Sequence, residues 1–204
     1  MGGMSREPGQ SAAAAADLRF LEPGVDPDSA PLPKPVTAAD HHLGKLGAPL
    51  QLIEYGDYEC PYCAMAQPGV RDLVARYGDG LVFAFRHLPL VSQHPHAWGA
   101  ALAAEAAGRQ GGFWEMHDLL LSHKRGLTHD DLVAYARQLD LDVVRLERDL
   151  TDDELAEHVR HDALSAIRSR VRGTPTFFVN GRRFEGGYRE AEIEEALRSA
   201  QRAG

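Results

Sequence analysis

The chain has 204 residues, of which 44% are hydrophobic and 25% are charged, with a formal net charge of -8 at pH 7. This composition is that of an ordinary globular protein with enough apolar residues for one core. The negative charge, with no Lys/Arg-rich run to offset it, argues against nucleic acid and anionic membrane surfaces as partners. No apolar run reaches the roughly 20 residues that membrane insertion requires.

The N-terminal segment, residues 1–36, is rich in Gly, Pro, Ser and Ala and has little apolar pattern. Such a segment cannot offset the entropy lost on ordering, so we predict a flexible tail. Its longest apolar run is five alanines, residues 12–16, followed by Asp17 and Arg19. This is not a signal-peptide pattern, and the sequence therefore predicts a cytoplasmic location.

Regular structure is predicted to begin near residue 48, with a buried strand over residues 50–55. A helix is predicted from Pro61 to Tyr77, with a kink at Pro68. A second strand, residues 81–86, follows. Together these segments predict a β-α-β unit.

Residues 93–169 have a continuous helical pattern interrupted by short breakers, which predicts an all-helical insertion. Strand pattern returns at residues 176–179, and Asn180-Gly181 is typical of a two-residue hairpin turn leading into residues 182–184. Residues 190–202 are predicted to form a closing amphipathic helix.

The two cysteines, Cys60 and Cys63, lie three positions apart where a strand and a loop lead into the first helix. Side chains at this spacing share one helical face, so the two sulfurs can form a disulfide with little backbone movement. Pro61 suits the first turn because its missing N–H would have had no partner. The helix N-terminus favours a thiolate at Cys60, the predicted nucleophile, and Cys63 is the predicted resolving thiol.

Local charge opposes this activation. Glu54, Asp57 and Glu59 lie close to the pair, and no basic residue or histidine occurs between Lys45 and Arg71. We expect the helix end to outweigh these carboxylates, because exposed charges are screened by water and salt.

A Cys-x-x-Cys pair can also be half of a zinc site, and the chain has ten histidines. No second such pair occurs, however, and histidines such as His94 and His96 follow no zinc-finger spacing. His158 and His161 share a helical face with charged neighbours, which favours a solvated surface over a metal site. We therefore predict neither a metal ion nor a cofactor, and a purely structural pair of reduced cysteines is a further alternative.

The order of motifs resembles the DsbA-like branch of the thioredoxin superfamily. The resemblance rests on residues 53–63, which contain Cys-Pro-Tyr-Cys, on residues 86–90 and 94–97, and on the later Gly-Thr-Pro-Thr-Phe-Phe-Val-Asn-Gly of residues 173–181. It covers roughly residues 40–200. It implies an α/β thioredoxin fold, a central mixed sheet flanked by helices, with the all-helical insertion dividing a thioredoxin-like domain.

In that reading, residues 37–92 and 170–204 form the thioredoxin-like domain and residues 93–169 form the insertion. The resemblance also implies a thiol–disulfide oxidoreductase that exchanges disulfides with protein or peptide substrates. Such a protein needs a redox partner or a low-molecular-weight thiol to restore its own cysteines. The resemblance also allows an extracytoplasmic location, whereas the N-terminal segment predicts a cytoplasmic one.

The resemblance further implies that Thr174-Pro175 is a cis peptide facing the disulfide, with Thr174 against the Cys60 sulfur. The backbone at Thr174 and Thr176 would pair with an extended substrate. The residues alone would not predict a cis bond, since only about 5–6% of X–Pro bonds in folded proteins are cis, and they leave open a trans proline at the start of an edge strand. Pro61 and Tyr62 would support the site, although Pro-Tyr differs from the Pro-His of the strongest oxidants in the family and matches glutaredoxins.

Two other functions remain as alternatives. A small-thiol (glutathione-type) dependent transferase or isomerase usually needs a single nucleophile, so Cys63 argues against it. A redox-inert binding module is disfavoured by the presence of both cysteines together with Thr174-Pro175.

Three histidines near the end of the second predicted strand are candidates for electrostatic support of the site: His87, His94 and His96.

Overall fold

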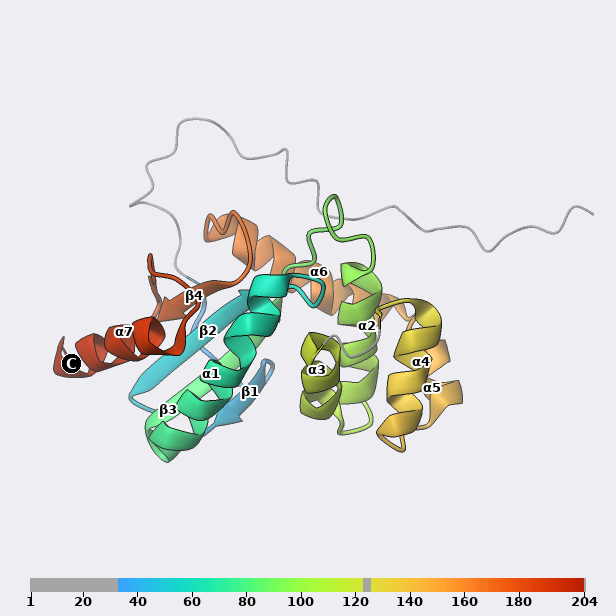
Figure 1. Ribbon diagram of the computed structural model, residues 1–204, viewed down its shortest axis with the longest axis horizontal. Helices are drawn as coiled ribbons and strands as arrows, with labels where there is room; N and C mark the ends of the chain where they lie inside the picture. Colours follow the sequence, from blue (N-terminus) through green and yellow to red (C-terminus); the bar gives the residue numbers. More distant parts are fainter. Residues whose placement is uncertain (1–32, 123–125, 204) are drawn as a thin grey trace, which may run out of the picture.

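The computed structural model describes residues 33–122 and 126–203. A mixed five-stranded sheet carries helices on both faces, and a group of helices lies beside it (Figure 1). The strands are β1 (His41–Gly44), β2 (Leu50–Gly56), β3 (Leu81–His87), β4 (Thr176–Val179) and β5 (Arg182–Arg183). Their spatial order is β1-β3-β2-β4-β5. Only β2 and β3 are parallel, and every other neighbouring pair is antiparallel.

The helices are α1 (Pro61–Tyr77), the short 3-10 turn η3 (Gly78–Gly80), α2 (Ala97–Gly108), α3 (Phe113–Ser122), α4 (His129–Gln138), α5 (Val143–Asp149), α6 (Asp153–Arg168) and α7 (Glu190–Ala203). Helices α1 and α7 pack on one face of the sheet, and α6 covers the other. The predicted thioredoxin fold with a helical insertion is therefore confirmed. Among the described residues, no helix is both long and apolar enough to cross a membrane.

The predicted β-α-β unit is formed by β2, α1 and β3, and the predicted hairpin by β4 and β5. Asn180 and Gly181 have φ angles of 46° and 77°, the left-handed values that a two-residue hairpin turn demands. One local prediction was wrong, because strand β1 precedes the expected start of structure. Helix α1 is continuous through Pro68, as its predicted bounds require.

Strand β1 escaped prediction because it is four residues long and polar at its start. It pairs with β3 at the edge of the sheet, so a tertiary contact and not an apolar pattern holds it in place. Of the predicted tail, residues 1–32 lie outside the described residues. Residues 33–36 contact the body: the Val36 N–H donates to Gln51 Oε1 at 3.0 Å, and Arg86 donates to the Lys34 carbonyl at 2.9 Å.

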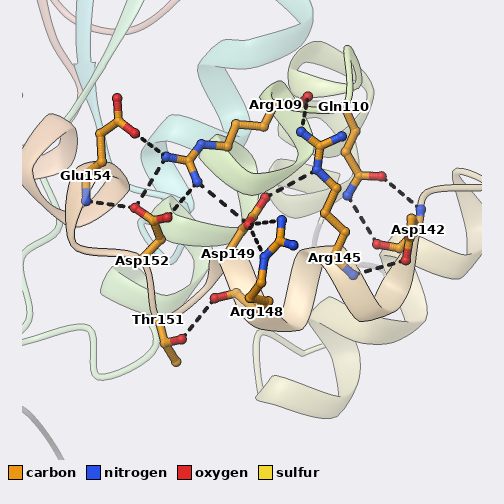
Figure 2. Close-up of polar contacts among 9 residues, drawn as sticks. All are labelled: Arg109, Gln110, Asp142, Arg145, Arg148, Asp149, Thr151, Asp152 and Glu154. Carbon is orange, nitrogen blue, oxygen red and sulfur yellow. Dashed lines mark hydrogen bonds and ion pairs between the residues drawn. The ribbon is translucent and has the colours of Figure 1, made fainter.

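A polar network ties the helices of the insertion together (Figure 2). The carboxylate of Asp149, only 1% exposed, lies 2.9 Å from Arg148, 3.6 Å from Arg145 and 3.7 Å from Arg109. Arg109 extends the network to Asp152 at 2.9 Å, at the start of α6. The end of α2 is thereby fixed to both α5 and α6.

Candidate functional site

Cys60 is the N-cap of α1, and Pro61 occupies the first helical position. The Cys60 carbonyl accepts the first helical hydrogen bond from Ala64 N at 3.2 Å. Cys63, one turn inside the helix, has no exposed surface, while 4% of Cys60 is exposed. Both are free thiols. The predicted order of a helix-end cysteine followed by a more enclosed one is thus the arrangement in the structure.

The segment before β4 faces this helix end. The Thr174–Pro175 peptide bond is cis, and Cys60 Sγ lies 3.2 Å from the Thr174 carbonyl oxygen, to which the thiol donates when it is protonated. Thr176 begins β4 and is buried, and its hydroxyl donates to the Gly173 carbonyl at 2.7 Å. Thr174 and Cys60, 114 residues apart in the chain, are therefore in direct contact.

The two thiols have opposite electrostatic environments. A hydrogen bond from the Cys63 thiol, helped by the backbone N–H groups of Tyr62 and Cys63, lowers the pKa of Cys60 to about 5 although burial opposes the shift. Burial raises the pKa of Cys63 well above its usual value, and the neighbouring Cys60 and Glu54 raise it further. Cys60 is therefore the thiolate at neutral pH, and Cys63 keeps its proton.

Glu54 is a buried acid beside the pair, which the sequence did not predict. We expected this carboxylate to be exposed and screened, but it is 2% exposed on β2. Burial, with repulsion from the Cys60 thiolate, raises its pKa to about 8, while a hydrogen bond with Cys63 opposes that rise. Glu54 is therefore mostly uncharged at pH 7 and does not oppose the thiolate as a full charge. Its position within the apolar run of residues 50–55 is the sequence signal for this burial.

Asp57 is also buried, contrary to expectation, and its carboxylate is fully engaged. It accepts from the backbone N–H groups of Glu59 and Leu90 and pairs with His94 Nδ1, each at 2.8 Å. Partial burial opposes protonation of His94, but Asp57 outweighs it and raises the pKa of this imidazole, with Cys60 and Glu59 adding to the effect. The protonated form of His94 is thus favoured near the thiolate.

The three histidines predicted as candidates separate in the structure. His94 lies beside the site through Asp57. His96 is exposed and contributes its backbone N–H to Glu59 at 2.7 Å. His87 is buried elsewhere, with Nε2 at 2.8 Å from Glu105, so it does not join the cysteines.

An exposed apolar rim borders the cysteines. Tyr62 is 53% exposed and Met65 is 60% exposed, and both extend from the first turns of α1. The ring of Tyr188 lies 5.4 Å from that of Tyr62, and its hydroxyl is 3.7 Å from Met65 Sδ.

The family model described as "Thioredoxin" matches residues 36–199. Among solved structures, a thioredoxin-like oxidoreductase from Silicibacter pomeroyi is 26% identical with a TM-score of 0.74, covering 82% of this chain and 95% of that one. BdbD from Bacillus subtilis, at 23% identity and a TM-score of 0.73, covers 85% and 98%. The thiol-disulfide exchange protein alpha-DsbA2 from Wolbachia pipientis, at 17% identity and a TM-score of 0.71, covers 79% and 87%.

Curated relatives have longer chains. The Na(+)/H(+) antiporter NhaA 1 of Salinispora arenicola is 48% identical over 176 residues, which is 86% of this chain and 25% of that protein. The antiporter NhaA of Herminiimonas arsenicoxydans is 42% identical, over 92% of this chain and 28% of that protein. The chain thus spans about a quarter of the length of these relatives.

The chain belongs to the thioredoxin family, and the helical insertion gives its fold the DsbA-like form.

Proposed function

We propose that the chain is a thiol–disulfide oxidoreductase that exchanges disulfides with protein or peptide substrates through Cys60 and Cys63. The observation that carries this proposal is the asymmetry of the pair, a stabilised thiolate at the helix end and a buried, protonated partner one turn inside. A nucleophile and a resolving thiol need these two states.

In the oxidising direction, a substrate thiolate attacks Cys60 Sγ of the Cys60–Cys63 disulfide. The bond between the two cysteines breaks, a substrate–Cys60 disulfide forms, and Cys63 leaves as a thiolate that takes a proton. A second substrate thiolate then attacks the substrate sulfur of the mixed disulfide and releases Cys60 as a thiolate. The substrate loses two electrons, the protein gains them, and a disulfide of the redox partner restores the starting state.

Glu54 is the group proposed to exchange the proton with Cys63. A neutral carboxyl can donate to the leaving Cys63 thiolate, and the carboxylate can accept the proton when Cys63 attacks in the reverse direction. A pKa of about 8 suits both roles near neutral pH. Because a stabilised Cys60 thiolate favours the reduced protein, the site supports oxidation of substrates as the favoured direction.

Substrates are proposed to bind as extended segments along Thr174 and Thr176, with apolar side chains against Tyr62. The antiporter names of the curated relatives add a candidate, a thiol of a membrane transporter, as partner. The cytoplasmic location stays a prediction from the sequence. Mixed disulfides trapped by Cys63→Ser in soluble and membrane fractions would identify the partner and its compartment.

The deciding experiment equilibrates the protein with reduced and oxidised glutathione and traps its free thiols. Wild type and Cys63→Ser are then compared in insulin reduction and in refolding of a scrambled protein. We expect a reversible two-electron transition in wild type and stalled mixed disulfides in the variant. The absence of a transition, with Cys63→Ser performing like wild type, would exclude exchange and favour the single-thiol transferase or the redox-inert module.

A further inference from the structure

A cluster of histidine and carboxylate side chains lies where the edge of the sheet meets the helical insertion. His41 comes from β1, Glu105 from α2 and His158 from α6. One ligand atom from each lies within 4.8 Å of the others. These three residues, the 41–105–158 cluster, take no part in the proposed disulfide exchange.

The distances within the cluster suit one small ion. His41 Nε2 lies 3.0 Å from Glu105 Oε1, and His158 Nε2 lies 3.8 Å from the same oxygen. Tetrahedral bonds of about 2.0 Å separate neighbouring ligand atoms by roughly 3.3 Å. These two separations bracket this value, and the third, between the His41 and His158 nitrogens, is at most 4.8 Å, so side-chain shifts would bring all three atoms to one zinc ion.

The surroundings hold two of the ligands in place. The His41 ring stacks on Phe113 with centroids 3.5 Å apart and planes 5° from parallel. Gly108 lies close beside both rings, since a side-chain carbon there would come within 3.0 Å of His41 and 3.5 Å of Phe113. His87 Nε2, 2.8 Å from Glu105 Oε1, fixes the carboxylate as an outer hydrogen-bond partner does in metal sites.

The donor atoms of the three side chains indicate which metal ion the cluster would bind. Two imidazole nitrogens with one carboxylate are a donor set for zinc and similar divalent transition metals, whereas magnesium and calcium prefer oxygen alone. Glu105 is only 5% exposed, so a cation would also balance a buried negative charge. His158 is 35% exposed, which gives an ion access from solvent.

We propose that His41, Glu105 and His158 form a three-residue binding site for a divalent transition metal ion, zinc in the first instance. The ion would take the place of the hydrogen on His41 Nε2 and leave a fourth coordination position for water. It would join the sheet to α2 and α6. The sequence predicted no metal because the three ligands lie more than 50 residues apart in separate elements.

The test uses Zn²⁺ and the Cys60→Ser/Cys63→Ser protein, because the cysteines could bind zinc themselves. We expect equilibrium dialysis to give one zinc ion per chain and Zn²⁺ to raise the melting temperature. At a hundredfold excess over the dissociation constant, the rise should be on the order of 5 °C. Co²⁺ should give the visible bands of a nitrogen and oxygen site without an intense thiolate absorption.

Adding His158→Gln to this background should weaken zinc binding at least tenfold and reduce the shift in melting temperature to about half or less at the same zinc concentration. His161→Gln, an exposed histidine on the same helix, is the matched control and should behave like its parent. Each variant is compared with its own metal-free form, so a general loss of stability does not affect the result. Binding well below one zinc per chain, or equal binding in the His158 and His161 variants, would overturn the proposal without touching the disulfide-exchange mechanism.

Discussion

His94 Nδ1 lies 2.8 Å from Asp57 Oδ2, a contact between a residue that precedes the two cysteines in the chain and one that follows them. Asp57 is buried and also contacts the cysteines directly, since its backbone N–H donates to Cys63 Sγ at 3.5 Å. The contact between His94 and Asp57 therefore connects the loop that follows β3 to the segment just before α1. It places an imidazole with a raised pKa beside a stretch of sequence that has acids and no basic residue.

Replacing His94 by Gln should raise the pKa of Cys60, because the thiolate loses a nearby positive charge. We expect a rise of less than about one unit, since direct contact between opposite charges shifts a pKa by roughly 1–3 units. The pH dependence of Cys60 alkylation measures it. His96→Gln is the control, because only the backbone of His96 contacts the site. An equal change of the Cys60 pKa in the two variants would show that the contact between His94 and Asp57 does not stabilise the thiolate.

Alkylation of the reduced wild-type protein should follow a single titration with a midpoint near pH 5, the pKa of Cys60. Mass spectrometry should place the label on Cys60 alone, because Cys63 is buried and protonated. Cys63→Ala should raise the midpoint by roughly 1–2 units, since the thiolate loses the hydrogen bond that lowers its pKa most. A wild-type midpoint near pH 9 would contradict the proposed activation.

The burial of Glu54 should contribute to the pH dependence of the stability of the reduced protein. Its pKa is raised from 4.5 to about 8 on folding, so the folded state holds a proton that the unfolded state has lost between these values. Glu54 alone makes stability fall as pH rises from about 4.5 to 8, whereas Cys60, whose pKa is lowered from 9.0 to about 5, makes stability rise with pH over about 5 to 9. The two effects should largely cancel in the reduced wild type, so Glu54→Gln should reveal a stability that rises with pH and should gain on the order of 3 kcal/mol at pH 7. Denaturant unfolding at pH 5, 7 and 8.5 measures the effect.

The same substitution should slow disulfide exchange, because an amide cannot exchange a proton with Cys63. We expect a loss of about tenfold to a hundredfold at pH 7, the lower part of the range for general acid–base catalysis. The loss should diminish at higher pH, where hydroxide can deprotonate Cys63. Stopped-flow fluorescence of the resolution step provides the rate. An unchanged rate at pH 7 would remove Glu54 from the mechanism.

Asp149→Asn should destabilise the insertion by about 1–3 kcal/mol, because a buried acceptor loses the charge that three arginines share. Urea unfolding gives the free energy. Glu154→Gln is the matched control, since this carboxylate also pairs with Arg109 but is 87% exposed. It should leave stability unchanged. Equal free energies of unfolding for the two variants would show that the buried position of Asp149 does not increase its contribution to stability.

The sequence by itself determined the local parts of this protein. The cysteine spacing at a helix start, the β-α-β unit and the Asn180-Gly181 turn depend on backbone geometry over a few residues. Each was predicted for that reason. The resemblance to a known family added the contact between Cys60 and Thr174, which no local pattern contains.

Only the tertiary structure decided the rest. Glu54 and Asp57 were expected to be exposed charges, but whether a carboxylate is buried depends on what packs over its strand. His87 is likewise buried against Glu105 instead of lying beside the cysteines, and this too depends on how the elements pack. The 41–105–158 cluster draws on three elements whose meeting depends on the order of strands and the docking of α2 and α6. Sequence spacing shows which residues lie close together within one helix or strand. Which residues of different elements come together depends on how those elements pack in the core.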